Sequence, residues 1–208
     1  MWDKIYKNKN QLSVWPWSEV VSLVNQYCFK NNSKSNTVLE LGFGVGANIP
    51  FFLKEKFHYY GIEQSKYAVN LCKKKFKKVK KNLIKGDFTK KNIGKVKFDL
   101  ILDRGSCTHL KFEHFKKFIE NLPKKLKNNG KFIFTDLFSD KTSSINNYKV
   151  NKKSLKKMGI KKFYNLKTIK MLFRDFNILY LSENTKNIFI KGKKVKIATW
   201  SAVLEKRV

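Results

Sequence analysis

From residue 37 onward, short apolar runs alternate with stretches whose apolar residues recur every three or four positions. Short apolar runs are typical of buried strands, and the longer spacing is typical of helices with one buried face. Strands are expected over 38–41, 59–63, 83–85, 98–103 and 131–138. Helices are expected over 47–56, 65–77 with Ser65 as its N-cap, and 112–127, which Pro123 interrupts late. This alternation predicts a parallel sheet that is covered on both faces.

The last third of the chain breaks this rhythm. One helix is expected over 166–176, followed by strands over 178–182 and 195–204 with a connection over 184–194. Because no long helix separates these two strands, they must be antiparallel neighbours. The chain therefore predicts an α/β fold: a seven-stranded, mostly parallel, doubly wound sheet of the Rossmann-like type with a C-terminal antiparallel hairpin.

Domain organisation follows from the same pattern. Residues 37–208 are expected to form the one domain, and residues 1–36 to form a segment that precedes its first strand. The polar stretch 139–153 is expected to be an excursion over the carboxyl edge of the sheet, where open α/β folds bind their ligands.

A glycine-rich turn with Gly42, Gly44 and Gly46 follows the first predicted strand. A strand that leads through such a turn into a helix presents backbone N–H groups to a ligand, and glycine has no Cβ to keep the ligand away. On its own the turn is ambiguous. Gly42-x-Gly44-x-x-Ala47, with Glu63 about 20 residues further on, also satisfies the dinucleotide fingerprint. A nicotinamide or flavin enzyme is therefore an open alternative at this point.

Three further features favour a different ligand. Glu40 lies at the strand end just before the first glycine, where a carboxylate would repel a pyrophosphate but attract the ammonium and sulfonium groups of S-adenosylmethionine. Gly86-Asp87-Phe88 follows the third strand, where Asp87 can accept a hydrogen bond from an adenine amino group and Phe88 can pack against the ring. The antiparallel hairpin at the C-terminus is foreign to ordinary dinucleotide folds.

The ordered set resembles the class I S-adenosylmethionine-dependent methyltransferases, over about residues 37–205. The residues that carry the resemblance are Glu40-x-Gly42-x-Gly44-x-Gly46, Glu63 and Gly86-Asp87-Phe88. The resemblance implies S-adenosylmethionine as cofactor and S-adenosylhomocysteine as product. It implies that the three glycines line the methionine and ribose part, that Glu63 accepts both ribose hydroxyls, and that Asp87 and Phe88 hold the adenine. Glu40 and Asp103 complete the expected cofactor-binding set.

The segment after the fourth strand, 102–109, would lie under the transferable methyl group in this family. It lacks the Pro-Pro-aromatic tetrapeptide of many amide and exocyclic-amine methyltransferases, which counts against DNA adenine methylation. Its Asp103-Arg104-Gly105 sequence, followed by a small residue, resembles thiopurine methyltransferase and its bacterial small-molecule relatives. Those relatives carry tryptophans in an N-terminal segment that folds over the cofactor, so Trp2 and Trp15 are expected to cover the cofactor here.

Three residues are candidates for catalysis. Arg104 either faces the substrate or forms a salt bridge to Asp103 or Asp136. His109 is the best candidate for a general base, because imidazole takes up a proton near neutral pH, although a cap or packing role is the simpler alternative. Asp136 ends the fifth strand on the ligand edge and could hold a substrate hydroxyl. Catalysis itself is expected to be mostly alignment, with a base needed only for a hydroxyl acceptor.

The net charge of +31 raises the possibility of a nucleic-acid partner. Only three of the 46 basic residues are arginines, however, and lysine pairs and triplets recur along the whole chain. A dedicated nucleic-acid reader would use more arginine, whose planar fork grips phosphates and bases in pairs. The charge therefore favours a solvated, compositionally biased surface, with a functional basic face as the alternative.

Other bulk features bear on location and metal binding. The chain has no run of about 18 apolar residues, so no membrane span is expected, and its N-terminus lacks the order of a signal peptide, which predicts the cytoplasm. Cys28, Cys72 and Cys107 stand far apart without a CxxC pair, which favours free thiols and argues against a metal site.

The sequence thus predicts methyl transfer from S-adenosylmethionine to an oxygen, nitrogen or sulfur atom of a small molecule, such as a metabolite or a sugar of a surface glycan. An RNA methyltransferase that uses the basic surface and a catalytically inactive cofactor-binding module are the alternatives. The acceptor atom, the pathway and the oligomeric state stay open.

Overall fold

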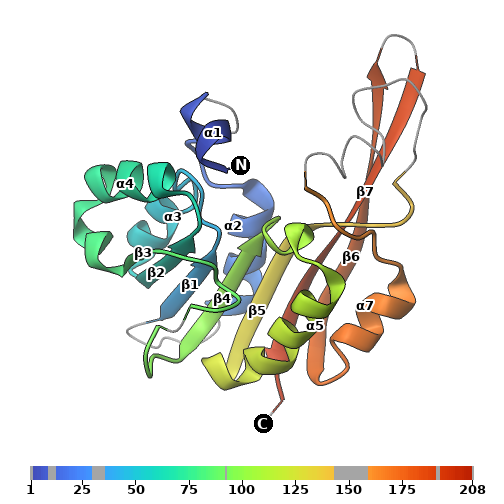
Figure 1. The fold of residues 1–208 in the computed structure, drawn as a ribbon. Coiled ribbons are helices and arrows are strands. Elements are labelled where there is room, and N and C mark those ends of the chain that lie inside the picture. The colour runs from blue at the N-terminus through green and yellow to red at the C-terminus, as the bar shows by residue number, and fades with distance from the viewer. Residues whose placement is uncertain are drawn as a thin grey trace.

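The computed structural model describes residues 2–8, 13–29, 36–91, 93–142, 159–190 and 193–207. At its centre lies a seven-stranded sheet with the order β3-β2-β1-β4-β5-β7-β6 (Figure 1). The strands are β1 (Thr37–Leu41), β2 (His58–Glu63), β3 (Leu83–Lys85), β4 (Phe98–Arg104), β5 (Leu126–Phe138), β6 (Phe176–Ile190) and β7 (Lys193–Lys206). The first five strands are parallel, and β7 runs antiparallel to both β5 and β6. The predicted seven-stranded sheet with an antiparallel C-terminal pair is confirmed.

Helices cover both faces of the sheet, as Figure 1 shows. They are α1 (Trp2–Lys7), α2 (Ser18–Cys28), α3 (Ile49–Lys54), α4 (Lys66–Lys75), α5 (Phe112–Asn121) and α7 (Leu166–Leu172), with short 3-10 turns η1 (Lys77–Asn82), η2 (Cys107–His109) and η3 (Leu122–Lys125). Successive side chains of a strand point to opposite faces. In β4, Leu100 and Leu102 accordingly pack with α2, α3 and α4, whereas Ile101 packs with α5 and α7.

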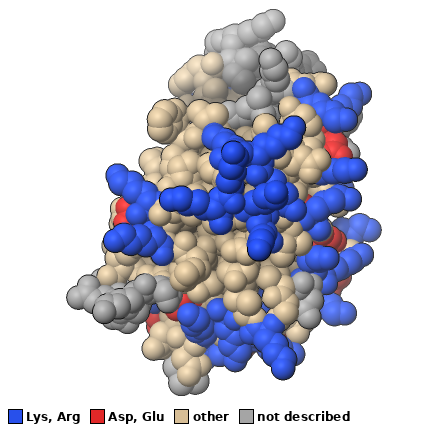
Figure 2. All heavy atoms as spheres, turned by 90° about the vertical axis from the view of Figure 1, so that its left-hand side faces the viewer, with Lys and Arg blue, Asp and Glu red and all other residues tan. Residues whose placement is uncertain are grey.

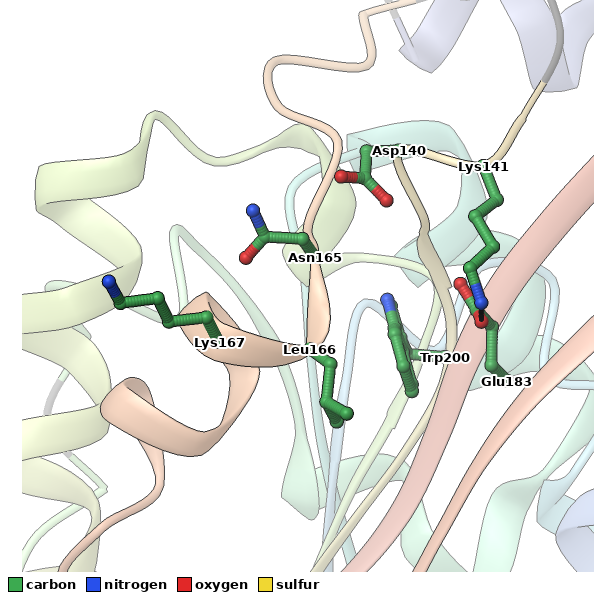
Figure 3. Close-up of a pocket in the computed structure, with 7 residues that line it drawn as sticks. All are labelled: Asp140, Lys141, Asn165, Leu166, Lys167, Glu183 and Trp200. Atoms are coloured by element: carbon green, nitrogen blue, oxygen red, sulfur yellow. Dashed lines mark hydrogen bonds and ion pairs between the residues drawn. The ribbon is translucent and has the colours of Figure 1, made fainter.

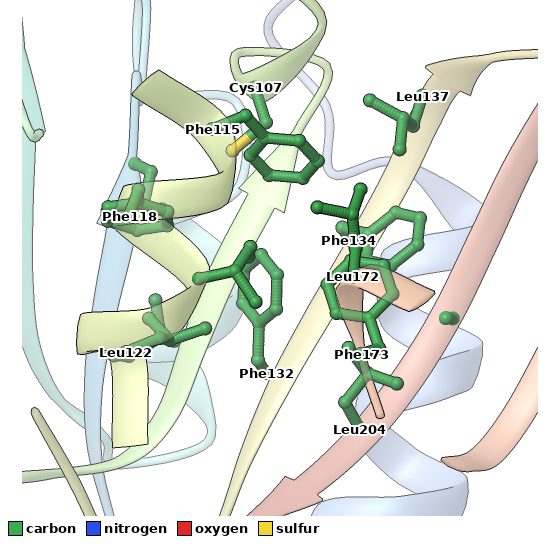
Figure 4. Close-up of a cluster of buried hydrophobic side chains, with 14 of the residues drawn as sticks. Cys107, Phe115, Phe118, Leu122, Phe132, Phe134, Leu137, Leu172, Phe173 and Leu204 are labelled. Carbon is green, nitrogen blue, oxygen red and sulfur yellow. The ribbon is translucent and has the colours of Figure 1, made fainter. Parts of the chain in front are cut away.

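The α5–α7 face is built largely from aromatic rings (Figure 4). Phe173, which follows α7, stacks on Phe134 of β5, with ring centroids 5.1 Å apart, and meets Phe115 of α5 edge-on at 6.2 Å. Such ring pairs stabilise a core beyond the area that they bury. This cluster fixes α5, α7 and the C-terminal strands to one another, and so it holds the carboxyl edge of β4 and β5 in place.

Two boundaries in the middle of the chain differ from the sequence prediction. Helix α3 starts at Ile49 rather than at 47, because the glycine turn extends further: Ile49 donates its N–H to the carbonyl of Gly46. Helix α5 ends at Asn121, since Pro123 cannot continue the hydrogen-bond ladder, and the chain enters β5 at Leu126 rather than at 131.

The C-terminal third differs more. Helix α7 ends at Leu172, and the next strand already begins at Phe176. The stretch 184–194, predicted as a connection, instead continues the β6–β7 ladder from the Asn184–Thr199 pair to the Ile190–Lys193 pair. Figure 1 shows this hairpin extending away from the body of the protein. Most of the excursion predicted over 139–153 falls outside the described residues.

Candidate functional site

The glycine turn lies at the carboxyl end of β1, in the middle of the sheet. β1 has β2 on one side and β4 on the other, so the strand order reverses here. In open α/β sheets, ligands bind beyond the carboxyl ends of the strands at such a point. Gly42, Gly44 and Gly46 have φ values of +64°, +56° and +81°, a backbone region that favours glycine. The backbone therefore takes the tight turn that the sequence predicts.

The three glycines face different surroundings. A Cβ on Gly42 would collide with the Ser106 side chain, and one on Gly44 would lie 2.9 Å from the Tyr6 hydroxyl. Both positions border the edge of the sheet where α1 and η2 meet. Gly46 differs, because its Cβ would meet side chains of α3 and α4, including Cys72 Sγ at 3.0 Å. The structure thus places Gly46 where the turn packs closely on these helices.

Glu63 ends β2 beside this turn and is buried. Its Oε2 accepts a hydrogen bond from the Gly44 N–H at 3.0 Å, and its Oε1 accepts one from the Ser65 N–H at 2.7 Å. Burial raises the pKa of Glu63, although these N–H donors oppose the shift. The backbone of Gln64 is a third donor to this carboxylate. Because a carboxylate has about four acceptor positions, Glu63 keeps about one beyond its three backbone partners.

Glu40 lies on the inner side of the turn. Its carboxylate is buried and accepts hydrogen bonds from Asn48 Nδ2 at 2.8 Å and from the Tyr59 hydroxyl at 2.6 Å. Asn48 Oδ1 in turn accepts a hydrogen bond from the backbone N–H of Trp17 at 3.2 Å. Burial raises the pKa of Glu40 to about 7, against the effect of its two donors. Glu40 therefore links the glycine turn to α3, β2 and the N-terminal segment.

Asp103 is also buried, at the end of β4. Its Oδ1 accepts hydrogen bonds from the N–H groups of Ser106, at 2.9 Å, and Cys107, at 3.1 Å, which form the start of η2. Burial raises the pKa of Asp103 to about 7, although these backbone donors lower it. In the structure, Asp103 thus holds the turn that carries Ser106 and His109.

Arg104 forms an ion pair with Asp136, with Nη2 3.0 Å from Oδ2. Its guanidinium also lies over the ring of Trp17, 3.5 Å from the centroid. Of the alternatives drawn from the sequence, the structure shows the salt bridge to Asp136 and not one to Asp103. Asp136 has a φ of +59°, so the backbone bends where β5 passes this pair. Arg104 and Asp136 are about one-third exposed and lie on the same edge as the glycine turn.

His109 lies under the N-terminal helix. Its ring meets that of Trp2 edge-on, with centroids 4.8 Å apart. Within the described residues, its Nδ1 is buried and has no hydrogen-bond partner. Burial lowers the pKa of His109, which favours the neutral imidazole. A neutral, unpartnered ring nitrogen can accept a proton or a hydrogen bond.

Helix α1 crosses the edge of the sheet between α4 and η2. At one side, Asp3 Oδ1 accepts hydrogen bonds from Ser65 Oγ at 2.5 Å and from the Tyr67 N–H at 3.0 Å. At the other side, Trp2 packs on His109, and Tyr6 lies buried against the glycine turn. The N-terminal helix is therefore anchored on both sides of the turn.

The Trp15 side chain, which is expected to cover the cofactor, is 78% exposed in this structure. Tyr6 and Trp17 are the aromatic side chains of this segment that contact the site: Tyr6 approaches Gly44, and Trp17 stacks on Arg104. The sequence shows six aromatic residues in this segment. It does not show which of them meets a charged or backbone partner from a distant strand.

Asp87 and Phe88 follow β3, next to Glu63. The Gly86 N–H donates to the Glu63 carbonyl at 3.0 Å, which joins the two strand ends. Asp87 Oδ1 accepts hydrogen bonds from the N–H and the hydroxyl of Thr89, and Phe88 meets the ring of Phe118 edge-on. The structure thus brings Asp87, Phe88 and Glu63 to one side of the glycine turn.

A separate hollow lies between α7 and the β6–β7 hairpin (Figure 3). Its volume is about 530 Å³, and its lining includes Trp200, Lys141 and Glu183, the last two joined as an ion pair. Trp200 is held by a hydrogen bond from its Nε1 to the Tyr164 carbonyl at 2.8 Å. Sequence reasoning missed this hollow, because its lining comes from four separate segments, one of them within the stretch 139–153 that was predicted as an excursion.

Three other features of the described residues concern membrane spanning, metal binding and nucleophilic cysteines. None of the helices within the described ranges is long and apolar enough to cross a membrane. The same ranges contain no group of three or more His, Cys, Asp and Glu side chains that could hold a metal ion. The three cysteines are free thiols, and burial raises the pKa of each of them, so none is an activated nucleophile.

Comparisons with known proteins agree with this geometry. Residues 39–134 match a family model described as a methyltransferase domain. No curated protein matches the chain. The chain is similar in structure to TehB from Haemophilus influenzae, with a TM-score of 0.70 and 14% identity over 99% of this chain and 67% of that one.

Two further solved structures are similar along most of their length. An S-adenosylmethionine-dependent methyltransferase from Anabaena variabilis has a TM-score of 0.67 and 19% identity, over 99% of this chain and 92% of that one. The N-methyltransferase NodS from Bradyrhizobium japonicum, solved with S-adenosylhomocysteine, has a TM-score of 0.63 and 15% identity, over 91% and 87%. The glycine turn at the point where the strand order reverses, with Glu63 beside it, agrees with these matches: the chain contains a methyltransferase domain, and S-adenosylmethionine is its cofactor.

Proposed function

We propose that this methyltransferase acts on a small-molecule acceptor, at an oxygen, nitrogen or sulfur atom, as in a metabolite or a sugar of a surface glycan. The supporting observation is the position of α1. Tyr6 lies against Gly44 and Trp2 against His109, so helix α1 covers the edge of the sheet that carries the glycine turn. A covered site admits a compact acceptor more readily than a folded polymer.

We propose that the N-terminal segment, residues 1–36, serves as this cover for the domain formed by residues 37–208. The contacts of Asp3 with Ser65 and Tyr67 support the proposal, because they fasten α1 to the helix that follows Glu63. A cover over the site also excludes water from the reacting atoms. Trp2 and Tyr6 are the covering side chains.

The residues around the glycine turn fit S-adenosylmethionine. The Glu63 carboxylate is the proposed acceptor for the ribose hydroxyls, and Gly42 and Gly44 form the turn beside it, against Ser106 and Tyr6. Asp87 and Phe88, joined to Glu63 through Gly86, are the proposed adenine contacts. Glu40, Asp103 and Gly46 are buried below this site. We propose that they hold the glycine turn and the turn after β4 in position.

The sulfonium supplies a methyl group that is already activated for displacement, so the chain's own residues mainly orient the acceptor. We propose that His109 accepts the proton of a hydroxyl acceptor at its unpartnered Nδ1. The Arg104–Asp136 pair, which lies at the ends of β4 and β5, is the proposed contact for a polar group of the acceptor.

The assignment of the chain to one branch of the methyltransferases rests on fewer residues. Asp103-Arg104-Gly105 and the covering Trp2 support a place near the thiopurine methyltransferase-like branch. The three free thiols suit a reducing compartment, and we propose the cytoplasm.

An activity screen tests the acceptor class. Purified protein is incubated with S-adenosylmethionine labelled in its methyl group, together with pools of thiols, amines, phenols and sugars and, separately, with total RNA. We expect label in at least one small-molecule pool, with a rate that falls at least tenfold in the His109→Asn variant if the acceptor is a hydroxyl. Label that enters RNA alone would contradict the proposal, and an absence of label in every pool would favour a module without turnover.

A further inference from the structure

The stretch between Glu63 and Asp87 contains nine lysines and no acidic residue. It forms α4, η1 and β3, at one edge of the sheet. We call the lysines of this stretch the lysine face: Lys66, Lys73, Lys74, Lys75, Lys77, Lys78, Lys80, Lys81 and Lys85. Eight of them are exposed, and Lys73 is half-buried.

Packing turns these side chains outward. The apolar residues Ala68, Val69 and Cys72 of α4 and Val79 of η1 are buried against the sheet, which leaves the lysines on the opposite side. Figure 2 shows Lys and Arg side chains gathered over this side of the molecule, with acidic side chains only toward its margins. The structure thus turns the lysines of this stretch toward one side of the molecule.

Ion pairs among the described residues involve only a few of the lysines, namely Lys127 with Asp99, Lys131 with Glu205 and Lys141 with Glu183. In the part of the chain that the structure describes, no ion pair joins a lysine of the lysine face to a carboxylate. Like charges held together in this way repel one another, and a polyanion that binds there relieves the repulsion and releases its counterions.

We propose that the lysine face is a docking surface for the phosphate backbone of a nucleic acid. Lysine offers a point charge rather than the planar fork of arginine, so we expect binding that depends on charge and not on base sequence. Among the large apolar residues of α4, η1 and β3, only Leu71 is exposed, which leaves little to insert into a membrane. The lysine face is extended and almost entirely cationic, so it fits a polymer with regularly spaced phosphates.

The η1 part of this surface is distinct from the methyl-transfer site, whereas Lys66 and Lys85 lie near it, next to Ser65 and in register with Glu63. The glycine turn follows the carboxyl end of β1, whereas η1 leads into the amino end of the parallel neighbour β3. Lys77 to Lys81 therefore lie at the opposite edge of the sheet. Docking would hold the enzyme on a nucleic acid without placing the polymer in the covered site.

A pair of matched variants of the full chain tests the proposal. In the first variant, six lysines of the lysine face are replaced by glutamine: Lys74, Lys75, Lys77, Lys78, Lys80 and Lys81. The control carries six exposed lysines near α5 and α7 as glutamine, which removes the same charge: Lys111, Lys116, Lys117, Lys124, Lys167 and Lys170. Each protein is titrated into a fluorescein-labelled single-stranded 20-nucleotide RNA at several salt concentrations, and binding is read as anisotropy.

We expect the first variant to bind RNA at least tenfold more weakly than the wild type and the control to stay within about threefold. The slope of log affinity against log salt should fall by about 2 to 4 in the first variant, since each lost phosphate contact removes about 0.7. Thermal stabilisation by S-adenosylhomocysteine should be unchanged in both, which separates this test from that of the cofactor site.

Equal weakening in both variants would overturn the proposal, because it would mean that charge anywhere on the surface is enough. A wild type that does not bind RNA would also overturn it. A parallel titration with phosphatidylserine vesicles distinguishes the other polyanion: binding to vesicles but not to RNA, lost in the first variant alone, would make the lysine face a membrane-docking surface instead.

Discussion

Replacing Glu63 with alanine is expected to abolish most of the thermal stabilisation that S-adenosylhomocysteine gives the protein. The buried carboxylate is the proposed acceptor for two ribose hydroxyls, and hydrogen bonds to a charged group contribute about 1.5–3 kcal/mol each. Losing both would weaken binding roughly a hundredfold or more. A ligand at 100 times its dissociation constant stabilises the wild type by about 2.7 kcal/mol, and the same concentration would then give only about 0.4 kcal/mol.

The unliganded variant needs its own baseline. Glu63→Ala also removes the acceptor for the Gly44 and Ser65 N–H groups, so its melting temperature without ligand should fall. The quantity to compare is therefore the shift on adding ligand, measured by differential scanning fluorimetry. Glu55→Ala, at an exposed position after α3, is the matched control and should keep the full shift. An unchanged affinity in Glu63→Ala would remove Glu63 from the ribose role.

Replacing Gly42 with alanine is expected to destabilise the fold more than any other single methyl group added to the site. The position has a φ of +64°, which costs a residue with a Cβ about 1–2 kcal/mol. The new Cβ would also collide with the Ser106 side chain, with Ser106 Cβ only 2.8 Å away. Because Ser106 Oγ donates a hydrogen bond to the Leu41 carbonyl, it cannot move without losing that bond. Together these effects should cost about 3 kcal/mol or more.

Gly94→Ala supplies a matched control for the backbone effect. Gly94 has a φ of +73°, but a Cβ there meets no atom within 4 Å. We expect this variant to lose only about 1 kcal/mol, measured by urea unfolding at equilibrium. Equal losses in the two variants would show that the approach of Ser106 to the glycine turn contributes nothing.

The fold and the cofactor site could be predicted to different depths. The parallel strands were predictable because each is a short apolar run bounded by turn residues, and the glycine turn because it joins such a run to a helix. The β6–β7 hairpin was underestimated. Thr185 to Asn187, in the outer part of β6, are all polar and exposed, so they carry no alternation of apolar and polar residues that would indicate a strand.

The contacts within the site could also be predicted only in part. Glu40, Asp103 and Arg104 were recognised as important charges, but their partners lie far along the chain. Tyr59 reaches Glu40 from β2, and Trp17 reaches Arg104 from the N-terminal segment. The sequence order alone does not indicate whether such a charge faces a ligand or another residue. For the same reason, the contacts of Tyr6 with the glycine turn and of Trp17 with Arg104 could not be read from the sequence.

The central claim is that the turn from Gly42 to Gly46 with Glu63 binds the products and substrates of methyl transfer rather than a dinucleotide. Isothermal titration of the wild-type protein with S-adenosylhomocysteine, and separately with NAD, tests it most directly. We expect one site for S-adenosylhomocysteine with a dissociation constant in the micromolar range or tighter, and no measurable heat of binding for NAD. Binding of NAD without binding of S-adenosylhomocysteine would contradict the account.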